Sequence, residues 1–327
     1  MSISLLLSLG TLFCINTFMV LSLTPSLLPK QLLSWLIGIC LFFVGRLIVP
    51  KNVTSSKWVI FIICCLFLVS PILLNHITRG SRRWINVGPL SLQPSELVKP
   101  FIALFLITSG QPLWVIIPMA IIMLQPDLGS AISYTVLAIP VIISRPRLIK
   151  MSLVVIIITA LISPIIWKFA LHDYQRNRII YFIEPQKDPL NKGYNVIQST
   201  IAIGSGGLTG QGFKSGSQGQ LLFLPEKQTD FIFASLSEEL GLIGIVTLLI
   251  AYFFLIKNLL AKAWQSSDTV QNLFTLAIAA EIWFQAFVNI GMNMGLLPVT
   301  GIPLPFVSVG GSSLMSLLFS LGIIFSK

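Results

Sequence analysis

The sequence is dominated by apolar runs that are long enough to cross a lipid bilayer and contain no charged residue. The first run, Met1–Pro29, has no Asp, Glu, Lys or Arg. Of the 327 residues, 55% are hydrophobic and only 10% are charged, whereas about a quarter are charged in an ordinary soluble domain. Such a composition excludes a soluble, disordered or fibrous protein. The bilayer must therefore be the solvent for most of this chain.

A transmembrane helix needs about 20 apolar residues. We predict spans at Ile3–Leu23, Gln31–Val49, Trp58–Leu74, Leu128–Ser144, Met151–Leu171, Phe231–Ile256, Leu273–Met294 and Val309–Phe325. A longer apolar stretch is interrupted at Ser109-Gly110-Gln111-Pro112, which favours two short helices, Glu96–Ser109 and Leu113–Gln125. The predicted fold is an all-α polytopic membrane protein with one domain over 1–327 and about ten spans. A single kinked helix in the interrupted stretch would make nine.

The short loops predict the orientation of these spans. In the ten-helix arrangement, three basic connections share one side: Lys51 with Lys57, Arg145 with Arg147 and Lys150, and Lys257 with Lys262. Since short cytoplasmic loops carry an excess of Lys and Arg, we assign this side, and both termini, to the cytoplasm.

The opposite side then carries its own cations. Arg79, Arg82 and Arg83 cluster in a loop of moderate length, against the positive-inside trend. Their residue type suits an anionic head group, although anchoring to lipid phosphates explains them equally well. The same side holds the largest non-apolar segment, 172–230. Loops of this length in a compact protein are usually functional or disordered, and the apolar residues within this one favour a docked, partly helical loop.

Two features of the 172–230 loop bear on chemistry. Asp188, held extended before a proline, could accept a proton as a general base, but a turn-forming Asp is the more common reason for this pattern. The glycine-rich segment Gly204–Gly212 could offer backbone N–H groups to phosphate oxygens. It lacks the Gly-Lys-Ser/Thr of a P-loop and the strand–helix context of a dinucleotide fold, so a flexible turn is the more common explanation.

Ionisable residues inside predicted spans are costly and call for a named partner. Glu238 and Glu239 lie two turns into a predicted span, where a polar cavity or a basic partner is expected. Thr229 or Asp230 can cap the same helix. Lys99 is predicted to pair with Glu238 or Glu239, or to snorkel from a helix end. Asp127 and Glu281 are the other ionisable residues in or beside spans, namely at the predicted start of Leu128–Ser144 and within Leu273–Met294.

The formal charge of +10 points to anionic lipids or an anionic substrate at the membrane surface rather than to nucleic acid, for which no motif is present. All four cysteines lie in apolar runs without a Cys-x-x-Cys pair, so neither a zinc site nor a disulfide framework is expected.

Several motifs occur together and in one order along the chain. They are Gly80-Ser-Arg-Arg-Trp-Ile-Asn-Val-Gly88, Gln93-Pro-Ser-Glu-Leu-Val-Lys99, Gln125-Pro-Asp-Leu-Gly129, His172-Asp-Tyr-Gln-Arg176, Asp188-Pro-Leu to Gly193-Tyr194, Gln198-Ser-Thr-Ile-Ala-Ile-Gly-Ser-Gly-Gly207, Phe223-Leu-Pro-Glu226, Thr229-Asp-Phe-Ile-Phe-Ala234, Glu238-Glu-Leu-Gly241 and Pro303-Leu-Pro-Phe-Val-Ser-Val-Gly-Gly311. Through them the chain resembles the SEDS family (shape, elongation, division and sporulation), and its elongation branch more than its division branch.

This resemblance implies a peptidoglycan glycosyltransferase that polymerises lipid II into β-1,4-linked glycan strands. It implies ten spans with a large extracytoplasmic loop between the seventh and eighth, in the bacterial plasma membrane. Asp188 matches the family's essential loop aspartate, which reverses the preference for a mere turn residue. Substrate contacts are expected from a further set of residues: Arg82, Arg83, Trp84, Lys99, Gln198, Ser199, Glu238 and Glu239.

The resemblance also implies partners: the lipid II substrate, a class B penicillin-binding protein with transpeptidase activity, the elongation machinery and membrane lipids. A divalent cation, Mg²⁺ or Mn²⁺, is an optional aid at the diphosphate, with only Asp and Glu side chains to hold it. Three alternatives remain: a lipid II flippase, a polymerase of the division branch, and a non-catalytic scaffold that recruits a transpeptidase.

Overall fold

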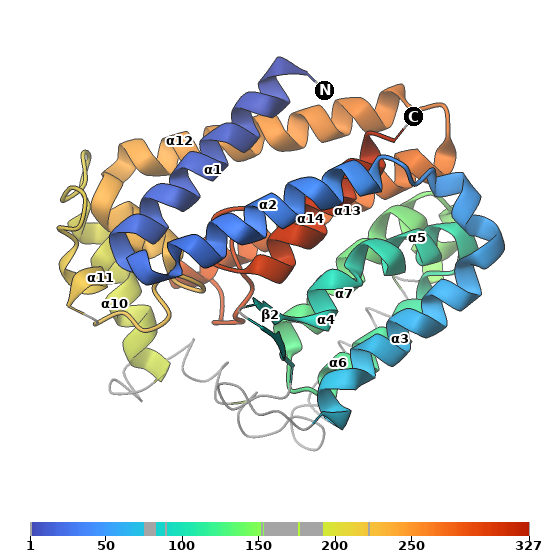
Figure 1. Cartoon of the computed structure of the whole chain (residues 1–327), viewed down its shortest axis with the longest axis horizontal. Helices are drawn as coiled ribbons and strands as arrows, with labels where there is room; N and C mark the ends of the chain where they lie inside the picture. The colour runs from blue at the N-terminus through green and yellow to red at the C-terminus, as the bar shows by residue number, and fades with distance from the viewer. Residues whose placement is uncertain are drawn as a thin grey trace.

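A computed structural model describes residues 2–74, 83–88, 90–151, 153, 176, 192–221 and 223–326. The described part is a bundle of helices (Figure 1). The helices are α1 (Ile3–Leu23), α2 (Leu28–Gly45), α3 (Lys57–Leu73), α4 (Pro94–Leu97), α5 (Lys99–Ser109), α6 (Ile116–Met123), α7 (Leu128–Ile143), α10 (Lys192–Ser205), α11 (Ser217–Gln220), α12 (Ile232–Gln265), α13 (Thr269–Asn293) and α14 (Gly311–Ile324). The all-α polytopic fold class is confirmed. Five helices of the described part are long and apolar enough to span a membrane, and shorter apolar helices accompany them.

The structure refines several predicted boundaries. The interrupted stretch is indeed two helices, since Gly110 adopts a left-handed conformation with φ of 67° and ends α5. Helix α2 ends at Gly45, before the predicted Val49. Helix α12 continues to Gln265, past the predicted Ile256, because lysines near a helix end can extend their charges to the interface. The predicted span Met151–Leu171 lies almost entirely outside the described residues.

One short antiparallel hairpin interrupts the helices. Strand β1 (Ile85–Val87) pairs with β2 (Leu90–Leu92), with Ile85 opposite Leu92. The hairpin was not predicted from the sequence. The hairpin leads directly into α4. Arg83, which precedes the hairpin, therefore lies close to Asp127 at the start of α7.

Small residues allow α2 and α14 to pack backbone against backbone. A Cβ atom on Gly322 would lie 2.1 Å from the carbonyl oxygen of Phe42, and one on Gly45 would lie 2.5 Å from that of Phe319. Close approach through small residues is the usual basis of helix association in membranes. The two helices run side by side in Figure 1.

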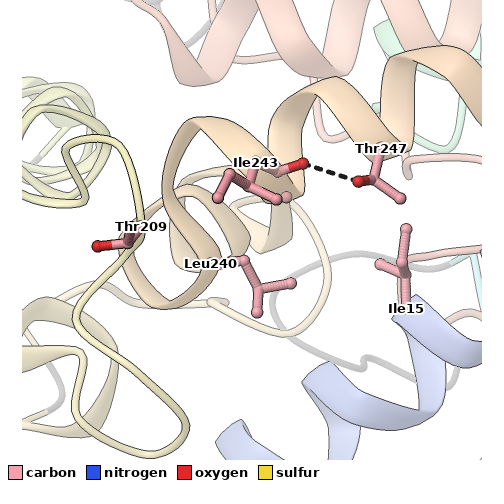
Figure 2. Close-up of a pocket in the computed structure, with 6 residues that line it drawn as sticks. Ile15, Thr209, Leu240, Ile243 and Thr247 are labelled. Atoms are coloured by element: carbon pink, nitrogen blue, oxygen red, sulfur yellow. Dashed lines mark hydrogen bonds between the residues drawn. The ribbon is translucent and has the colours of Figure 1, made fainter.

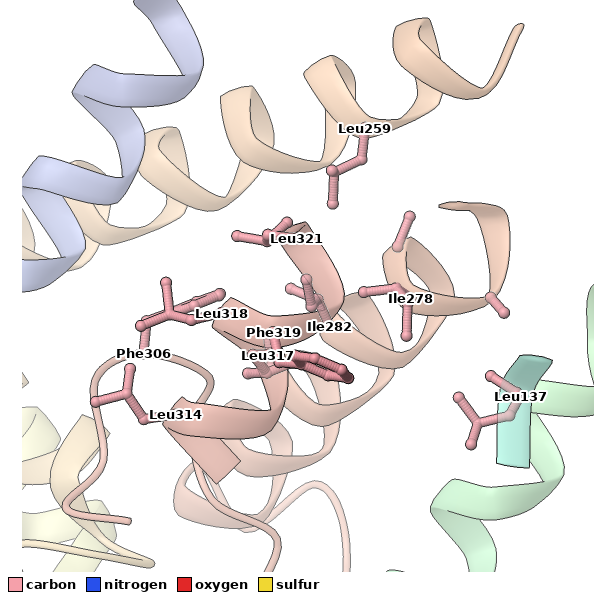
Figure 3. Close-up of a cluster of buried hydrophobic side chains, with 14 of the residues drawn as sticks. Leu137, Leu259, Ile278, Ile282, Phe306, Leu314, Leu317, Leu318, Phe319 and Leu321 are labelled. Atoms are coloured by element: carbon pink, nitrogen blue, oxygen red, sulfur yellow. The ribbon is translucent and has the colours of Figure 1, made fainter. Parts of the chain in front are cut away.

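The apolar core is centred on α14. Leu314, Leu317, Leu318, Phe319 and Leu321 of α14 are buried, and Figure 3 shows them among side chains from α7, α12 and α13. All residues of α14 from Ser312 to Ile324 are buried. Helix α14 is therefore the central column of the described bundle.

The two ends of the bundle differ in charge. Near one end, Ser2 donates a hydrogen bond to Asn258, Lys262 lies over the ring of Phe325, and Arg145 donates to the carbonyl of Gly110. We call this the basic end; it carries Arg46, Lys57, Arg145, Arg147, Lys150, Lys257 and Lys262. Both chain termini lie at this end, towards the top of Figure 1. We call the opposite end, which holds Gln93, Asp127, Asp230, Glu238 and Asn293, the site end.

Candidate functional site

The site end gathers most of the predicted site residues that the structure describes. Arg83, Trp84, Gln198, Ser199, Glu238 and Glu239 belong to it. Arg82 and Asp188 lie outside the described residues. Lys99 lies deeper, within the core.

Arg83 is anchored by a buried carboxylate. Its Nη1 atom lies 3.3 Å from Oδ2 of Asp127, and the Arg83 side chain is 27% exposed while that of Asp127 is 5% exposed. Asp127 caps α7, accepting from the backbone N–H of Ser130 at 3.1 Å and from its hydroxyl at 2.8 Å. Gln93 donates to the same Oδ2 at 3.0 Å. A partly exposed cation is thus held at the site end.

Lys99 was predicted to pair with Glu238 or Glu239, but it pairs with neither. Its Nζ atom lies 2.8 Å from Oε1 of Glu96 and 2.8 Å from Oε1 of Glu281. Gln285 donates to the same oxygen of Glu281 at 2.8 Å. The prediction was wrong because α5 packs against α13 and α7, whereas Glu238 and Glu239 of α12 are bonded to the α11 loop and to α1. Lys99, Glu96 and Glu281 are all buried.

Glu238 anchors the loop that contains α11. Its carboxylate accepts hydrogen bonds from the backbone N–H groups of Gln218 at 2.8 Å and Gly219 at 3.1 Å. The side chain of Ser217 donates to it at 3.2 Å. The Glu238 carboxylate therefore satisfies the orphan N–H groups of a short helix, as expected for an acid at such a position.

Glu239 joins the same loop to α1. Its Oε1 atom accepts from the hydroxyl of Ser22 at 2.5 Å and from the side-chain amide of Gln220 at 3.2 Å. Lys227 lies in the same neighbourhood, donating to the carbonyl of Gly219 at 2.5 Å. Burial lowers the pKa of Lys227, and the nearby Glu239 and Glu238 oppose that shift. The expected polar surroundings of the two glutamates are therefore present.

The glycine-rich segment is docked on a break in α12. Gly241 has φ of 62° and ψ of −158°, which interrupts the helix. The N–H of Gln211 donates to the carbonyl of Glu238 at 2.9 Å, and that of Leu242 donates to Gly207 at 3.0 Å. A Cβ atom on Gly210 would lie 2.1 Å from the carbonyl oxygen of Glu239. Glycine is thus required for close backbone contact, and this contact argues against a flexible turn. The docked, partly helical loop is confirmed over 192–221.

Two asparagines that the sequence analysis missed join four segments at the site end. Asn293 accepts from the backbone N–H of Ala234 at 3.1 Å and donates to the carbonyl of Asp230 at 2.9 Å. Ser199 donates to the carbonyl of Asn293 at 2.7 Å. Asn289 donates to Ile302 at 2.8 Å. The predicted contact residue Ser199 is therefore buried in a structural network, whereas Gln198 and Trp84 are half-buried.

The predicted caps Thr229 and Asp230 do not cap α12. Phe231 takes the N-cap position and its own side chain makes no capping hydrogen bond, so the Asn293 side chain of α13 accepts the N–H of Ala234 in its place. Instead the carbonyl of Thr229 accepts from the hydroxyl of Ser308 at 2.6 Å, and Asn16 of α1 donates to Val307 at 2.6 Å. The non-helical segment before α14 is therefore held in protein, as backbone at membrane depth must be.

An apolar pocket of about 300 Å³ lies between α1, α12 and the glycine-rich segment. Ile15, Thr209, Leu240, Ile243 and Thr247 line it with Gly244, and Thr247 turns its hydroxyl back to the carbonyl of Ile243 (Figure 2). The described residues of its lining include no ionisable side chain, and such an apolar lining suits a lipid chain.

Within the described residues, no three His, Cys, Asp or Glu side chains are grouped closely enough to hold a metal ion. The optional divalent cation at the diphosphate remains a prediction.

Comparison with known proteins gives consistent results along the chain. The family model of the FtsW/RodA/SpoVE proteins, described as cell cycle proteins, matches residues 1–326. The chain is 39% identical over 303 residues to the peptidoglycan glycosyltransferase MrdB of Escherichia coli K12, covering 88% of this chain and 82% of that protein.

The chain also matches solved structures over nearly its whole length. One, which concerns structural coordination of polymerization and crosslinking by a peptidoglycan synthase complex, matches with a TM-score of 0.83 at 30% identity, covering 98% of this chain and 95% of that chain. The rod shape determining protein RodA of Thermus thermophilus matches with a TM-score of 0.71 at 25% identity, covering 98% and 94%. The resemblance found in the motifs is thereby confirmed, and the chain belongs to the FtsW/RodA/SpoVE (SEDS) family.

Proposed function

We propose that this protein is a peptidoglycan glycosyltransferase that polymerises lipid II during cell elongation. The observation that carries the proposal is the 39% identity, over 88% of the chain, to an enzyme named for that activity. The structure adds an anchored arginine at the site end, where an anionic head group would arrive.

The charge of the two ends supports an orientation. The basic end carries the short Lys- and Arg-rich loops, so the positive-inside rule places it, with both termini, in the cytoplasm of a bacterial plasma membrane. The site end and the 172–230 loop then face outward, where lipid II is polymerised.

In the proposed reaction, Asp188 takes the proton of the acceptor 4-hydroxyl while that oxygen attacks the anomeric carbon of the donor sugar. The new bond is β-1,4, and the bond from the anomeric carbon to the diphosphate breaks. The polyprenyl diphosphate leaves with both electrons of that bond. Arg82 and Arg83 bind the diphosphate oxygens, a task that suits the planar guanidinium. Trp84 follows Arg83 directly in the sequence, and both Trp84 and Gln198 are half-buried at the site end.

The other four predicted contact residues are buried within the protein. Lys99, Ser199, Glu238 and Glu239 are buried and engaged in protein contacts, so their contribution to substrate binding is to hold the site's walls. A class B penicillin-binding protein would cross-link the product, and a related solved structure concerns polymerization together with crosslinking.

Arg83→Ala tests the diphosphate contact. We expect the variant to need about tenfold more lipid II for half-maximal polymerisation, since a charge-assisted hydrogen bond contributes about 1.5–3 kcal/mol. Lys214→Ala is the matched control, because Lys214 is an exposed cation of the same end. An unchanged lipid II dependence for Arg83→Ala would leave Arg83 as a lipid anchor only.

A flippase is the second candidate, because the buried Lys99, Glu96 and Glu281 resemble the ionisable clusters of transporters. Liposomes with labelled lipid II in one leaflet separate the two activities. A polymerase lengthens glycan without moving the label to the other leaflet. Movement of the label without polymer would favour the flippase.

A further inference from the structure

The guanidinium of Arg83 has one donor edge occupied and another without an acceptor. Nη1 is directed at Oδ2 of Asp127, 3.3 Å away. The Nε–H group is buried and has no hydrogen-bond acceptor among the residues that the structure describes. A buried donor without an acceptor is unfavourable, and the imbalance is removed if a ligand oxygen arrives.

Asp127 is the fixed partner in this pair. Its Oδ2 atom accepts from Gln93, from the hydroxyl of Ser130 and from Arg83, while Oδ1 accepts from the backbone N–H of Ser130. Only 4% of the residue is exposed. A carboxylate held by donors from α7 and from the residue before α4 has one orientation, and it imposes that orientation on the arginine.

We propose that Asp127 is a positioning residue for lipid-linked diphosphate: it holds Arg83 so that the unoccupied Nε edge of the guanidinium meets a phosphate oxygen. This inference rests on the proposed function. A free arginine side chain would lose its rotamer freedom on binding, whereas an arginine held by Asp127 has already lost it. The chain therefore gains affinity for the diphosphate without a further cation.

Asp127→Asn tests the assignment without removing the helix cap, because Asn caps as well as Asp. The new side chain keeps an oxygen for the N–H of Ser130 but presents an NH₂ group where Oδ2 was. That group faces donors from Arg83 and Gln93, so Arg83 is released. Asp268→Asn is the matched control, since Asp268 caps α13 at the basic end through the N–H of Val270.

We expect Asp127→Asn to raise the KM for lipid II about tenfold and to change kcat less than about twofold, as for the loss of a binding interaction that is the same in ground and transition states. Asp268→Asn should change neither value. In an Arg83→Ala background, Asp127→Asn should have no further effect on KM, since its action passes through Arg83.

Two results would overturn the assignment. If Asp127→Asn raises KM equally with and without Arg83, Asp127 has a general structural role and does not position Arg83. A fall in KM would mean that Asp127 competes with the diphosphate instead of orienting its partner.

A direct binding measurement separates this inference from the proposed function. Binding of undecaprenyl diphosphate to the purified protein in detergent should weaken about tenfold in Asp127→Asn and stay unchanged in Asp268→Asn. If the unaltered protein makes no polymer from lipid II, the proposed function fails, whatever the binding result. If it makes polymer but binding is insensitive to Asp127, only the positioning role fails.

Discussion

At the scale of single residues, the buried cluster of Lys99, Glu96 and Glu281 links three helices. One lysine bridges two carboxylates, at 2.8 Å each, inside the bundle. Removing one partner of a buried ion pair leaves a charge without compensation, which typically costs about 3–5 kcal/mol. The cluster therefore holds α4 and α5 against α13 by a contact that tolerates little change.

Lys99→Ala should lower the thermal unfolding midpoint in detergent more than Glu281→Gln does. The alanine variant leaves two facing carboxylates without a cation, whereas the glutamine variant leaves Lys99 paired with Glu96. Differential scanning fluorimetry of both variants measures the difference. Equal midpoints, or a lower midpoint for Glu281→Gln, would contradict this account.

The sequence predicted which ionisable residues matter better than it predicted which residues they contact. Arg83 and Asp127 could both be singled out, because ionisable residues beside spans are rare. The partner of Lys99 could not, since it depends on which helices are neighbours. Asn16, Asn289 and Asn293 were missed because an amide in an apolar helix gives no periodic signal, although a polar residue at membrane depth was itself a clue.

At the scale of elements, the break in α12 at Gly241 determines where the glycine-rich segment docks. The positive φ of Gly241 and the 2.3 Å that would separate its Cβ from the backbone nitrogen of Gly210 leave no room for a side chain. The break was not predicted, because a lone glycine inside a long apolar window is compatible with a continuous helix.

Gly241→Ala should detach the 206–212 segment, with a loss of stability of about 1–3 kcal/mol from the strained backbone alone. Amide hydrogen exchange across 206–212 should become faster. Gly204→Ala is the control, because nothing lies within 4 Å of its added Cβ, and alanine favours the helix by about 1 kcal/mol. Unchanged exchange in Gly241→Ala would show that the segment docks without this glycine.

The helices could be predicted closely, and the hairpin could not. Apolar windows fix the existence and the approximate ends of the spans, as Ile3–Leu23 illustrates. Strands of three residues, β1 and β2, are too short for an alternating pattern to be recognised. The hairpin matters for function because it carries the chain from Arg83 to Gln93.

At the scale of the whole molecule, the site end can meet outward-facing lipid II only if the two ends face opposite compartments. Two exposed positions can carry the probe in a variant without the four native cysteines: Ser215→Cys, just after the glycine-rich segment, and Ser267→Cys, between α12 and α13. In intact spheroplasts, a membrane-impermeant maleimide should label the first and not the second. The reverse pattern would place the site end in the cytoplasm and exclude polymerisation at the outer face.

The most direct test of the central claim is polymerisation of purified lipid II by the purified protein and by Asp188→Asn. We expect glycan polymer from the unaltered protein. The amide of the variant cannot accept the acceptor's proton, so its polymerisation rate should fall by at least about a hundredfold, the lower range for general-base catalysis. Matching thermal midpoints would show that the variant is folded. Polymer formation by Asp188→Asn at the unaltered rate would contradict the account.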